Sequence, residues 1–387
     1  MTAFHLECGG CGRTSDPAPL AALCPSCASP QLVRYAAVST GPNVELRDVW
    51  GARSGGMWRY REVLPLLPGE APVSLGEGAT PLVPIPRSGD ALNLQLLIKD
   101  EGGNPTGSFK DRGLSAAVTR AVHDGAAGFV LPSAGNAGVA LAAYAARAGV
   151  QATIFIPVDT PRAVFDRCEA YAAVVIPVEG LISDCGARAA EHAAETGAFD
   201  LATLREPYRI EGKKTMGLEI LEDLGWKAPD AILYPTGGGT GLIGTWKALR
   251  EASALGLIGE PATRLYAVQA TGCAPIVRAW EAGLEAADPW TDPETTAWGL
   301  RVPSARGDTL MLRALRDSGG GAICVDDRDM RAEARRLATS DGVAAGIEGG
   351  ATLAAAAQLR ERGDLAVGET VVLFNTGNLG NYGWYTG

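Results

Sequence analysis

Short runs of apolar residues alternate along most of the chain with longer stretches in which apolar positions recur every three or four residues. The short runs predict strands, because a strand buried on both faces needs about four to eight apolar residues. The longer stretches predict helices, since their apolar positions gather on one face. The predicted strands lie at 93–99, 128–131, 152–157, 174–178, 231–234, 265–269 and 370–374, and the predicted helices at 107–124, 136–148, 162–170, 183–196, 215–224, 241–254, 330–340 and 351–362.

This alternation of strand and helix predicts an α/β fold, in which helices cover both faces of parallel sheets. A chain of 387 residues is long enough for two domains of ordinary size. Apolar residues make up 47% of the chain, which excludes a disordered protein. The 50 glycines show no three-residue period, so we expect them in tight turns and where backbone approaches a ligand.

Charge and hydropathy narrow the range of partners. The 34 basic and 44 acidic residues give a net charge of −10 without a basic stripe, so no nucleic-acid partner is expected. The most apolar stretch, 138–150, is shorter than the roughly 20 residues of a membrane-spanning helix and contains Arg147. The first residues lack the basic and apolar regions of a secretory signal. We therefore expect a cytoplasmic protein with no membrane partner.

Four of the eight cysteines lie close together near the N-terminus. Cys8, Cys11, Cys24 and Cys27 have the spacing C-x2-C-x12-C-x2-C, so that two CxxC turns could present four thiolates to one tetrahedral ion. This pattern predicts a structural zinc site in a zinc-ribbon-like module, with no open position for catalysis. The alternative is four free thiols in a loose N-terminal arm.

Two loops that follow predicted strands carry polar side chains near the start of a helix. Lys110 lies in NPTGSFKDRG, where the helix dipole disfavours a cation and so favours the neutral amine that forms a Schiff base. Its spacing alone favours an ordinary surface lysine. Asn136 lies in SAGNAG, where its amide either caps the helix or contacts a flat ligand.

Two further loops complete the candidate chemistry. The segment PTGGGTG at 235–241 joins a strand to a helix, and consecutive glycines there let backbone N–H groups converge on a phosphate. It lacks the GK[ST] of a nucleotide P-loop. Thr376 follows the last strand, and its hydroxyl either faces the same ligand or belongs to a simple turn. A reactive lysine, a phosphate cradle, an amide and a hydroxyl together suggest pyridoxal phosphate.

Taken in order, SFKDRG, SAGNAG, GGGTG and the terminal NTG resemble the fold-type II pyridoxal-phosphate enzymes. NPTGSFKDRG, EGKKT at 211–215, GLRVP at 299–303 and the cysteine-rich start are most similar to the threonine synthase family. The resemblance implies two parallel-sheet α/β domains, an amino-acid substrate and a homodimer. It also implies these boundaries: a zinc-ribbon-like module at 1–45, a large cofactor-binding domain at 46–112 and 215–387, and a small mobile domain at 113–214.

The resemblance also implies roles for individual residues. Lys110 would form the Schiff base with the cofactor and move protons at the substrate carbons, while Phe109 would pack near the cofactor ring. Asn136 would bond the phenolic oxygen, and the hydroxyl of Thr376 would face the pyridine nitrogen. The cofactor phosphate would be held by Gly237, Gly238, Gly239, Thr240 and Gly241.

The backbone amides of Ser133 and Asn136 would receive the substrate carboxylate. The substrate of the family, O-phosphohomoserine, also requires a second anion site for its phosphate, built from hydroxyls and an arginine, for which Arg209 is the candidate. Where the family has threonines around Asn136, this chain has Ala134 and Ala137, and Leu204 replaces an expected serine. Losing such hydroxyl donors would cost roughly 1.5–3 kcal/mol each. The alternatives are therefore a serine or threonine dehydratase, or a β- or γ-replacement synthase that makes a non-proteinogenic amino acid. A non-catalytic relative is disfavoured because SFKDRG is intact.

Overall fold

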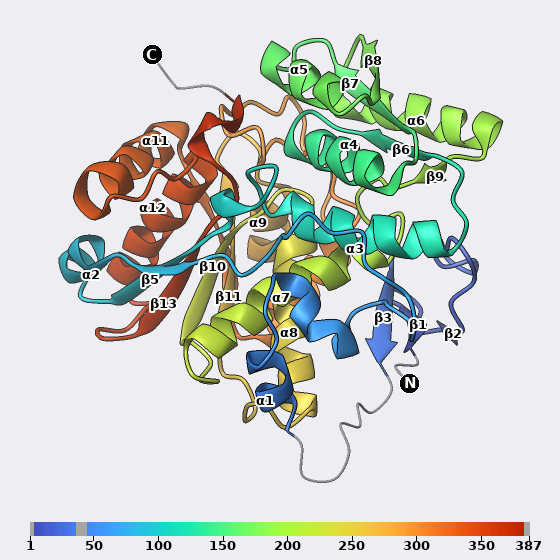
Figure 1. The fold of residues 1–387 in the computed structure, drawn as a ribbon. Coiled ribbons are helices and arrows are strands. Elements are labelled where there is room, and N and C mark those ends of the chain that lie inside the picture. The colour runs from blue at the N-terminus through green and yellow to red at the C-terminus, as the bar shows by residue number, and fades with distance from the viewer. Residues whose placement is uncertain (1–3, 36–44, 383–387) are drawn as a thin grey trace. The chain divides into compact units, whose positions relative to one another are not determined.

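The computed structural model describes residues 4–35 and 45–382, which form two compact units (Figure 1). Of the described residues, unit 1 comprises 4–35, 45–79, 104–215 and 381–382, and unit 2 comprises 80–103 and 216–380. Helix α7 (Tyr208–Asp223) runs from one unit into the other. The domain boundaries expected from the sequence remain predictions, and the one near residue 45 adjoins 36–44, which lie outside the described residues.

Unit 1 begins with a small antiparallel sheet formed by the cysteine-rich segment. Its order is β2-β1-β3, with β1 at Phe4–Cys8, β2 at Thr14–Ser15 and β3 at Gln31–Tyr35. Phe4 and Leu6 of β1 and Val33 of β3 are buried, because alternate residues of a strand point to the same face. This apolar face joins the main core of unit 1.

A parallel sheet of four strands, in the order β8-β7-β6-β9, forms the centre of unit 1. On one face Ile154 and Ile156 of β7 pack with α4 and α5, and on the other Phe155 packs with α6. The strands are β6 (Phe129–Pro132), β7 (Ala152–Pro157), β8 (Val174–Val178) and β9 (Phe199–Asp200), and the helices are α1 (Leu46–Gly51), α3 (Lys110–His123), α4 (Asn136–Ala148), α5 (Arg162–Ala170) and α6 (Ile182–Thr196).

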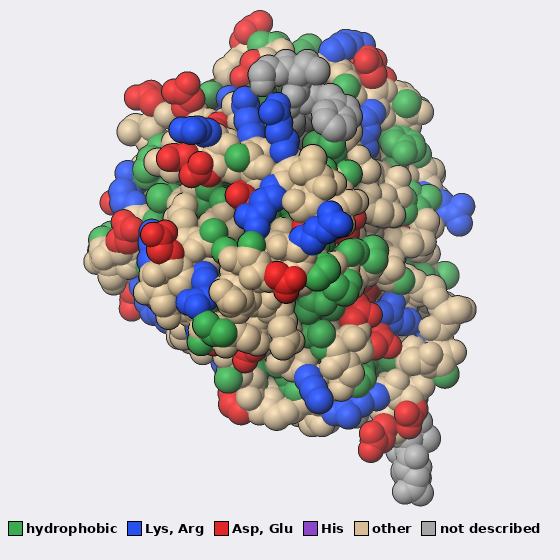
Figure 2. Space-filling model, turned by 90° about the vertical axis from the view of Figure 1, so that its left-hand side faces the viewer, with side chains coloured by type: hydrophobic (Ala, Val, Ile, Leu, Met, Phe, Trp, Pro, Cys, Tyr) green, Lys and Arg blue, Asp and Glu red, His purple; other side chains and the backbone are tan. Residues whose placement is uncertain are grey.

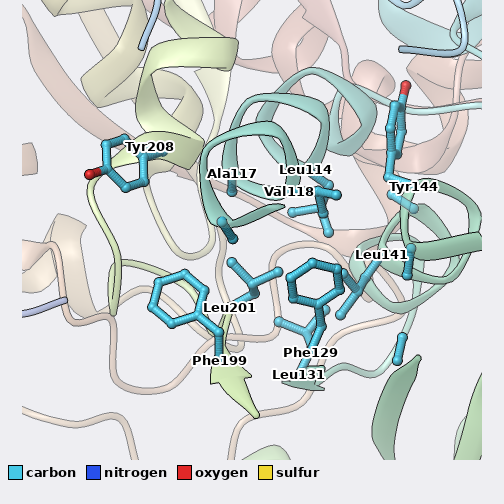
Figure 3. Packing of buried hydrophobic residues seen from close by; sticks show 14 of the residues in the cluster. Leu114, Ala117, Val118, Phe129, Leu131, Leu141, Tyr144, Phe199, Leu201 and Tyr208 are labelled. Atoms are coloured by element: carbon cyan, nitrogen blue, oxygen red, sulfur yellow. The ribbon is translucent and has the colours of Figure 1, made fainter. Parts of the chain in front are cut away.

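The main core of unit 1 fixes the helix that carries Lys110. Figure 3 shows Leu114, Ala117 and Val118 of α3 pointing toward the buried side chains of β6 and β9. These residues form one continuous apolar face of α3, because they recur at the three- and four-residue spacing that places side chains on the same side of a helix. The start of α3 is therefore held by packing along the whole helix.

Unit 2 is built on a sheet of six strands in the order β12-β11-β10-β13-β5-β4. All neighbours are parallel except β4, which pairs antiparallel with β5 at the edge. The strands are β4 (Leu82–Pro84), β5 (Gln95–Asp100), β10 (Ala231–Pro235), β11 (Arg264–Ala270), β12 (Gly321–Val325) and β13 (Thr370–Asn375). Every residue of β10 is buried, as expected for a central strand with helices on both faces.

The helices of unit 2 connect these strands. Helix α12 packs against four strands of the sheet, and α11 packs against α12. The helices are α2 (Pro86–Leu92), α8 (Thr240–Ala254), α9 (Pro275–Glu281), α10 (Asp308–Asp317), α11 (Asp327–Arg336) and α12 (Ile347–Arg362). Short helical segments of other types lie at Met57–Val63 of unit 1, Glu101–Gly103, Leu337–Asp341 and Leu379–Tyr382.

The predicted α/β class is confirmed, and the strands and helices predicted from periodicity all exist, most of them within a few residues of their expected ends. One difference is informative: α7 begins at Tyr208, whereas the apolar pattern places its start at 215. Its first turns carry the charged residues Arg209, Glu211 and Lys213, which are buried and so break the usual contrast between apolar and polar faces.

The described surface carries both signs of charge. On the face drawn in Figure 2, acidic and basic side chains are interspersed with apolar ones. Among the described helices, none combines the length and the apolar character that crossing a membrane requires.

Candidate active site

Lys110 is the first residue of α3, and its loop is fixed by short polar contacts. The Thr106 backbone N–H donates to Asp111 Oδ2 at 2.6 Å, and Gly107, at φ +79°, closes a turn by donating to Asn104 O at 2.7 Å. The Lys110 Nζ atom lies 3.8 Å from the centroid of the Phe109 ring, and the lysine side chain is only partly buried. Lys110 is thus held at a helix start, and its side chain is not fully enclosed.

The Asn136 loop follows β6, and the hydroxyl of Ser133 organises it. Ser133 Oγ accepts hydrogen bonds from the N–H groups of Gly138 at 2.8 Å and Gly135 at 3.2 Å. Helix α4 begins at Asn136 and takes Gly135, not Asn136, as its N-cap, so the capping role considered for the asparagine amide is wrong. Ala134 and Ala137 on either side are partly exposed and offer no hydroxyl.

The glycine loop of unit 2 leads from β10 into α8, which starts at Thr240 with Gly239 as its N-cap. Gly239 has φ +79°, and a Cβ there would overlap the Met311 sulfur. A Cβ on Gly237 would likewise overlap the Gly299 carbonyl oxygen, and one on Gly241 the Tyr234 hydroxyl. Only glycines fit this turn at those three positions, and it brings backbone N–H groups to the positive end of a 15-residue helix.

Thr376 follows β13 in the same unit and is 9% exposed. The residue before it, Asn375, ties this strand end to its surroundings: its Nδ2 donates to Asp100 Oδ1 at 2.7 Å, and its Oδ1 accepts from Gly346 N at 3.1 Å. The position of the Thr376 backbone is therefore set by the end of β5 and by the residue that precedes α12.

Arg209 lies in the first turn of α7 and is 1% exposed. Its Nη1 donates to Leu201 O at 2.7 Å, while its Nε has no hydrogen-bond partner among residues 4–35 and 45–382. Burial lowers the pKa of this guanidinium, and the charges of Glu206 and Asp200 oppose that shift. A buried donor of this kind is expected to have a partner when the protein is at work.

Sequence reasoning assigned no role to two buried charged residues beside Arg209. Glu206 Oε2 caps α7 by accepting from the N–H groups of Tyr208 at 2.6 Å and Arg209 at 3.0 Å, and burial raises the pKa of Glu206 to about 7. Lys213, in EGKKT, is completely buried, and burial holds its pKa well below the usual value for lysine. The sequence feature that could have pointed to Lys213 is the adjacent pair Lys213-Lys214, because it lies in a helical segment that has no polar face on which to expose both lysines.

The predicted site residues fall into two sets. Phe109, Lys110, Ser133, Asn136 and Arg209 belong to unit 1, whereas the glycine loop and Thr376 belong to unit 2. Within unit 1 the structure brings Lys110 onto the ring of Phe109 and Ser133 onto the loop of Asn136. Within unit 2 it brings the glycines of the loop together at the start of α8.

The four N-terminal cysteines also come together. Their sulfur atoms all lie within 4.8 Å of one another, with Cys8 and Cys27 at 3.4 Å and Cys11 and Cys24 at 3.8 Å. Cys8 Sγ accepts hydrogen bonds from the N–H groups of Gly10 and Cys11, at 3.4 and 3.3 Å, which is how the first CxxC turn closes. The cysteine-rich segment of β1–β3 thus brings together four sulfur atoms that could bind one metal ion.

Known proteins resemble this chain over most of its length. Residues 73–377 match the family of pyridoxal-phosphate dependent enzymes. A threonine synthase of Methanosarcina acetivorans is 32% identical over 378 residues, which cover 97% of this chain and 92% of that protein. A threonine synthase of Mycobacterium leprae is 34% identical over 320 residues, covering 82% and 86% of the two chains.

Solved structures share the fold. Maize serine racemase superposes with a TM-score of 0.68 at 24% identity and covers 77% of this chain and 88% of its own. A T.th. threonine deaminase superposes with a TM-score of 0.66 at 27% identity, covering 77% and 92%. The likeness to the racemase bears on the fold alone. The family match and the extent of the threonine synthase alignments establish that this chain belongs to the pyridoxal-phosphate dependent enzymes and, within them, to the threonine synthase family.

Proposed function

We propose that this enzyme converts O-phosphohomoserine and water to threonine and phosphate. The observation that carries the proposal is Lys110, a partly exposed amine at the start of α3, in a chain that aligns along 97% of its length with a threonine synthase. Pyridoxal phosphate, when bound, withdraws electrons from the substrate Cα and so makes the hydrogens of Cα and its neighbours acidic. The residues of the chain then bind the substrate and move protons.

The glycine loop fits the phosphate of this cofactor. Three glycines stand where any Cβ would overlap a neighbouring atom, and the N–H groups at the start of α8 suit a dianion. We propose that Gly237, Gly238, Gly239, Thr240 and Gly241 hold the cofactor phosphate.

We propose that the remaining cofactor contacts are Phe109 and Asn136 of unit 1 and Thr376 of unit 2. A neutral threonine hydroxyl at the ring nitrogen does not stabilise a protonated ring, unlike a carboxylate. This favours elimination and replacement over transamination.

Lys110 is proposed to carry the proton transfers. Its amine accepts the Cα proton and one Cβ proton while the phosphate departs from Cγ, and it returns one proton to Cγ and one to Cα. Water supplies the hydroxyl that adds at Cβ, and its remaining proton leaves with the phosphate, which balances the reaction. The backbone amides of the Ser133–Asn136 loop receive the substrate carboxylate, and Arg209 faces the substrate phosphate. Ser133 Oγ acts by holding that loop in shape, since its hydrogen bonds run to Gly135 and Gly138.

The alternative is a dehydratase or a replacement synthase with the same cofactor chemistry. The methyl groups of Ala134 and Ala137 favour it, because they stand where hydroxyl donors to a substrate phosphate are expected. The T.th. threonine deaminase, at 27% identity, keeps this alternative open.

A substrate panel on the purified holoenzyme separates these functions. Release of inorganic phosphate and threonine from O-phosphohomoserine supports the synthase, and release of ammonia and a 2-oxo acid from serine or threonine supports the dehydratase. Turnover only of O-acylated homologues supports a replacement synthase. Lys110→Ala should lose all three activities and the visible absorbance of the lysine-bound cofactor. Persistence of that absorbance in the variant would show that another amine binds the cofactor.

We also propose that Cys8, Cys11, Cys24 and Cys27 bind a structural zinc ion. A Zn–S bond of about 2.3 Å places the sulfurs of a tetrahedral site about 3.8 Å apart, close to the spacing of the four sulfurs here. Metal analysis should find one zinc per chain and none in a Cys8→Ser/Cys11→Ser variant. A purified chain that contains no metal and has four titratable thiols at these positions would contradict the proposal.

The family resemblance further leads us to propose a homodimer. Sedimentation equilibrium of the holoenzyme should give twice the chain mass of 40.0 kDa, and a monomer at micromolar concentration would contradict it.

A further inference from the structure

Lys213 lies beside the reactive lysine although no role follows for it from the cofactor chemistry. Its Nζ atom is 4.7 Å from the centroid of the Phe109 ring, and Lys110 Nζ is 3.8 Å from the same centroid. Both amines therefore contact one aromatic side chain of unit 1. Lys110 is partly exposed, whereas Lys213 is completely buried in the second turn of α7.

The backbone of the two helices leaves space for this side chain. A Cβ on Gly113 of α3 would lie 2.8 Å from Lys213 Cε and 2.9 Å from the Arg209 carbonyl oxygen. A Cβ on Gly212 of α7 would overlap the carbonyl oxygen of Arg112. Gly113, the glycine of SFKDRG, thus allows α7 to approach α3 so closely that the aliphatic part of the Lys213 side chain packs against the α3 backbone.

Cations outnumber carboxylates among the charges that shift the pKa of Lys213. Arg209 of its own helix and Lys110 of α3 lower that pKa after burial, and Glu206 before α7 raises it. Glu206 caps α7 through Oε2, while its buried Oε1 has no hydrogen-bond partner among the described residues. Cations buried close to one another are costly, and an anion that enters beside them relieves that cost.

The adjacent lysine provides a contrast. Lys214 Nζ lies 2.7 Å from Glu211 Oε2, and both side chains are fully buried. Tyr35 Oη donates to the same carboxylate oxygen at 2.8 Å. Lys214 therefore has an internal counter-ion and a structural role, whereas two of the three charges that shift the pKa of Lys213 are cationic.

We propose that Lys213 is a specificity-determining residue that binds the anionic leaving group of the substrate together with Arg209. This inference rests on the proposed function and names the group that selects its substrate. Arg209 Nε, buried and without a partner among the described residues, supplies the second donor. The two cations take the place of the hydroxyls that Ala134 and Ala137 lack, and they favour a dianionic leaving group over a neutral one.

Binding of an anion at Lys213 and Arg209 should be accompanied by uptake of a proton, which distinguishes this site from an ordinary pair of charged residues. Because burial and the charge of Arg209 favour the neutral amine, Lys213 gains a proton when a dianion binds, so binding should tighten as the pH falls. Protonation of Glu206, whose pKa is about 7, would act in the same direction and must be separated from it. Arg209 stays charged throughout, and Lys110 is covalently engaged in the holoenzyme.

Inorganic sulfate is the probe, because it remains a dianion throughout the neutral pH range. Calorimetric titration of the holoenzyme in buffers of different ionisation enthalpy measures both the sulfate affinity and the protons taken up. We expect about one proton per sulfate for the wild type and for Glu206→Gln. Lys213→Gln should bind sulfate about ten- to a hundredfold more weakly without uptake, and Lys213→Arg should bind it without uptake.

Lys247→Gln is the matched control, since Lys247 is also buried and pairs with Glu251 on α8 of unit 2. It should leave sulfate binding unchanged. Sulfate affinity and proton uptake in Lys213→Gln equal to the wild type would overturn the inference, as would uptake that disappears only in Glu206→Gln. If the wild type fails to turn over O-phosphohomoserine, the proposed function is wrong, while the sulfate titration still decides the role of Lys213.

Discussion

Replacing Gly113 by alanine tests the close contact between α3 and α7. The added methyl group would stand 2.9 Å from a backbone oxygen of Arg209 and 2.8 Å from Cε of Lys213. The lysine stem can move, but the carbonyl oxygen belongs to the first turn of α7 and can yield only if the two helices separate. Gly113→Ala should therefore loosen α3 and displace the Lys213 amine from the Phe109 ring.

The size of the effect follows from a matched glycine. Gly186 occupies a comparable position in α6, and a Cβ there has no neighbour within 4 Å. Alanine stabilises a helix interior by roughly 1 kcal/mol relative to glycine, so Gly186→Ala should gain that amount. Gly113→Ala has the same helical gain but adds an overpacking cost of about 1–3 kcal/mol. The difference between the two variants isolates the cost of the α3–α7 contact.

Amide hydrogen exchange measures this difference locally, in α3 for one variant and in α6 for the other. Relative to the wild type, protection should rise about fivefold in α6 of Gly186→Ala. In Gly113→Ala, the protection factors of the α3 amides should be about five- to 150-fold lower than a fivefold rise over the wild type would give. Sulfate affinity should fall in Gly113→Ala alone. A Gly113→Ala variant as protected as Gly186→Ala would refute the claim that this glycine makes room for α7.

Three further predictions concern the groups around α7. Tyr35→Phe removes a 2.8 Å hydrogen bond to the buried Glu211 carboxylate and should cost about 1–3 kcal/mol of stability, seen as a lower melting temperature; an unchanged melting temperature would contradict it. Glu206 keeps its proton up to about pH 7 when folded but loses it near 4.5 when unfolded, so its contribution to stability falls as the pH rises between these values. Glu206→Gln should remove that slope from the unfolding free energy, and a slope equal to the wild type would refute the assignment. Removing metal with a chelator should lower the melting temperature of the holoenzyme and expose the β1–β3 segment to proteolysis, and equal protease resistance with and without chelator would argue against a structural metal.

Periodicity was sufficient for the fold because most strands and helices here have ordinary apolar patterns. The strands of both parallel sheets are short, and central ones such as β7 and β10 are wholly buried. Some of the elements that were not predicted have little pattern to offer, although the unpredicted helix α10 is clearly amphipathic. The two-residue strands β2 and β9 are too short for any period, and β12 follows directly on two glycines.

The candidate site was predicted only where its residues lie in loops with unusual composition. Lys110, Asn136 and the glycine loop stand out because a helix begins there after a loop rich in small residues. Lys213 and Glu206 did not stand out, since their importance comes from burial and neighbours that are distant in sequence. No local pattern reports that Gly113 faces Lys213, which lies 100 positions later.

Helix α7 joins features that lie far apart in the sequence. Its first turns hold Arg209 and Lys213 near Phe109, and Glu211 of the same turns binds Tyr35 of the cysteine-rich sheet. Phe4 of that sheet also packs edge-on against Tyr208, with ring centroids 6.3 Å apart. A displacement of the sheet would therefore move the turns that carry both cations. The EGKKT motif is best understood as two adjacent lysines with different tasks: Lys214 fixes α7 to the sheet through Glu211, and Lys213 uses that fixed position to present a charge to the substrate.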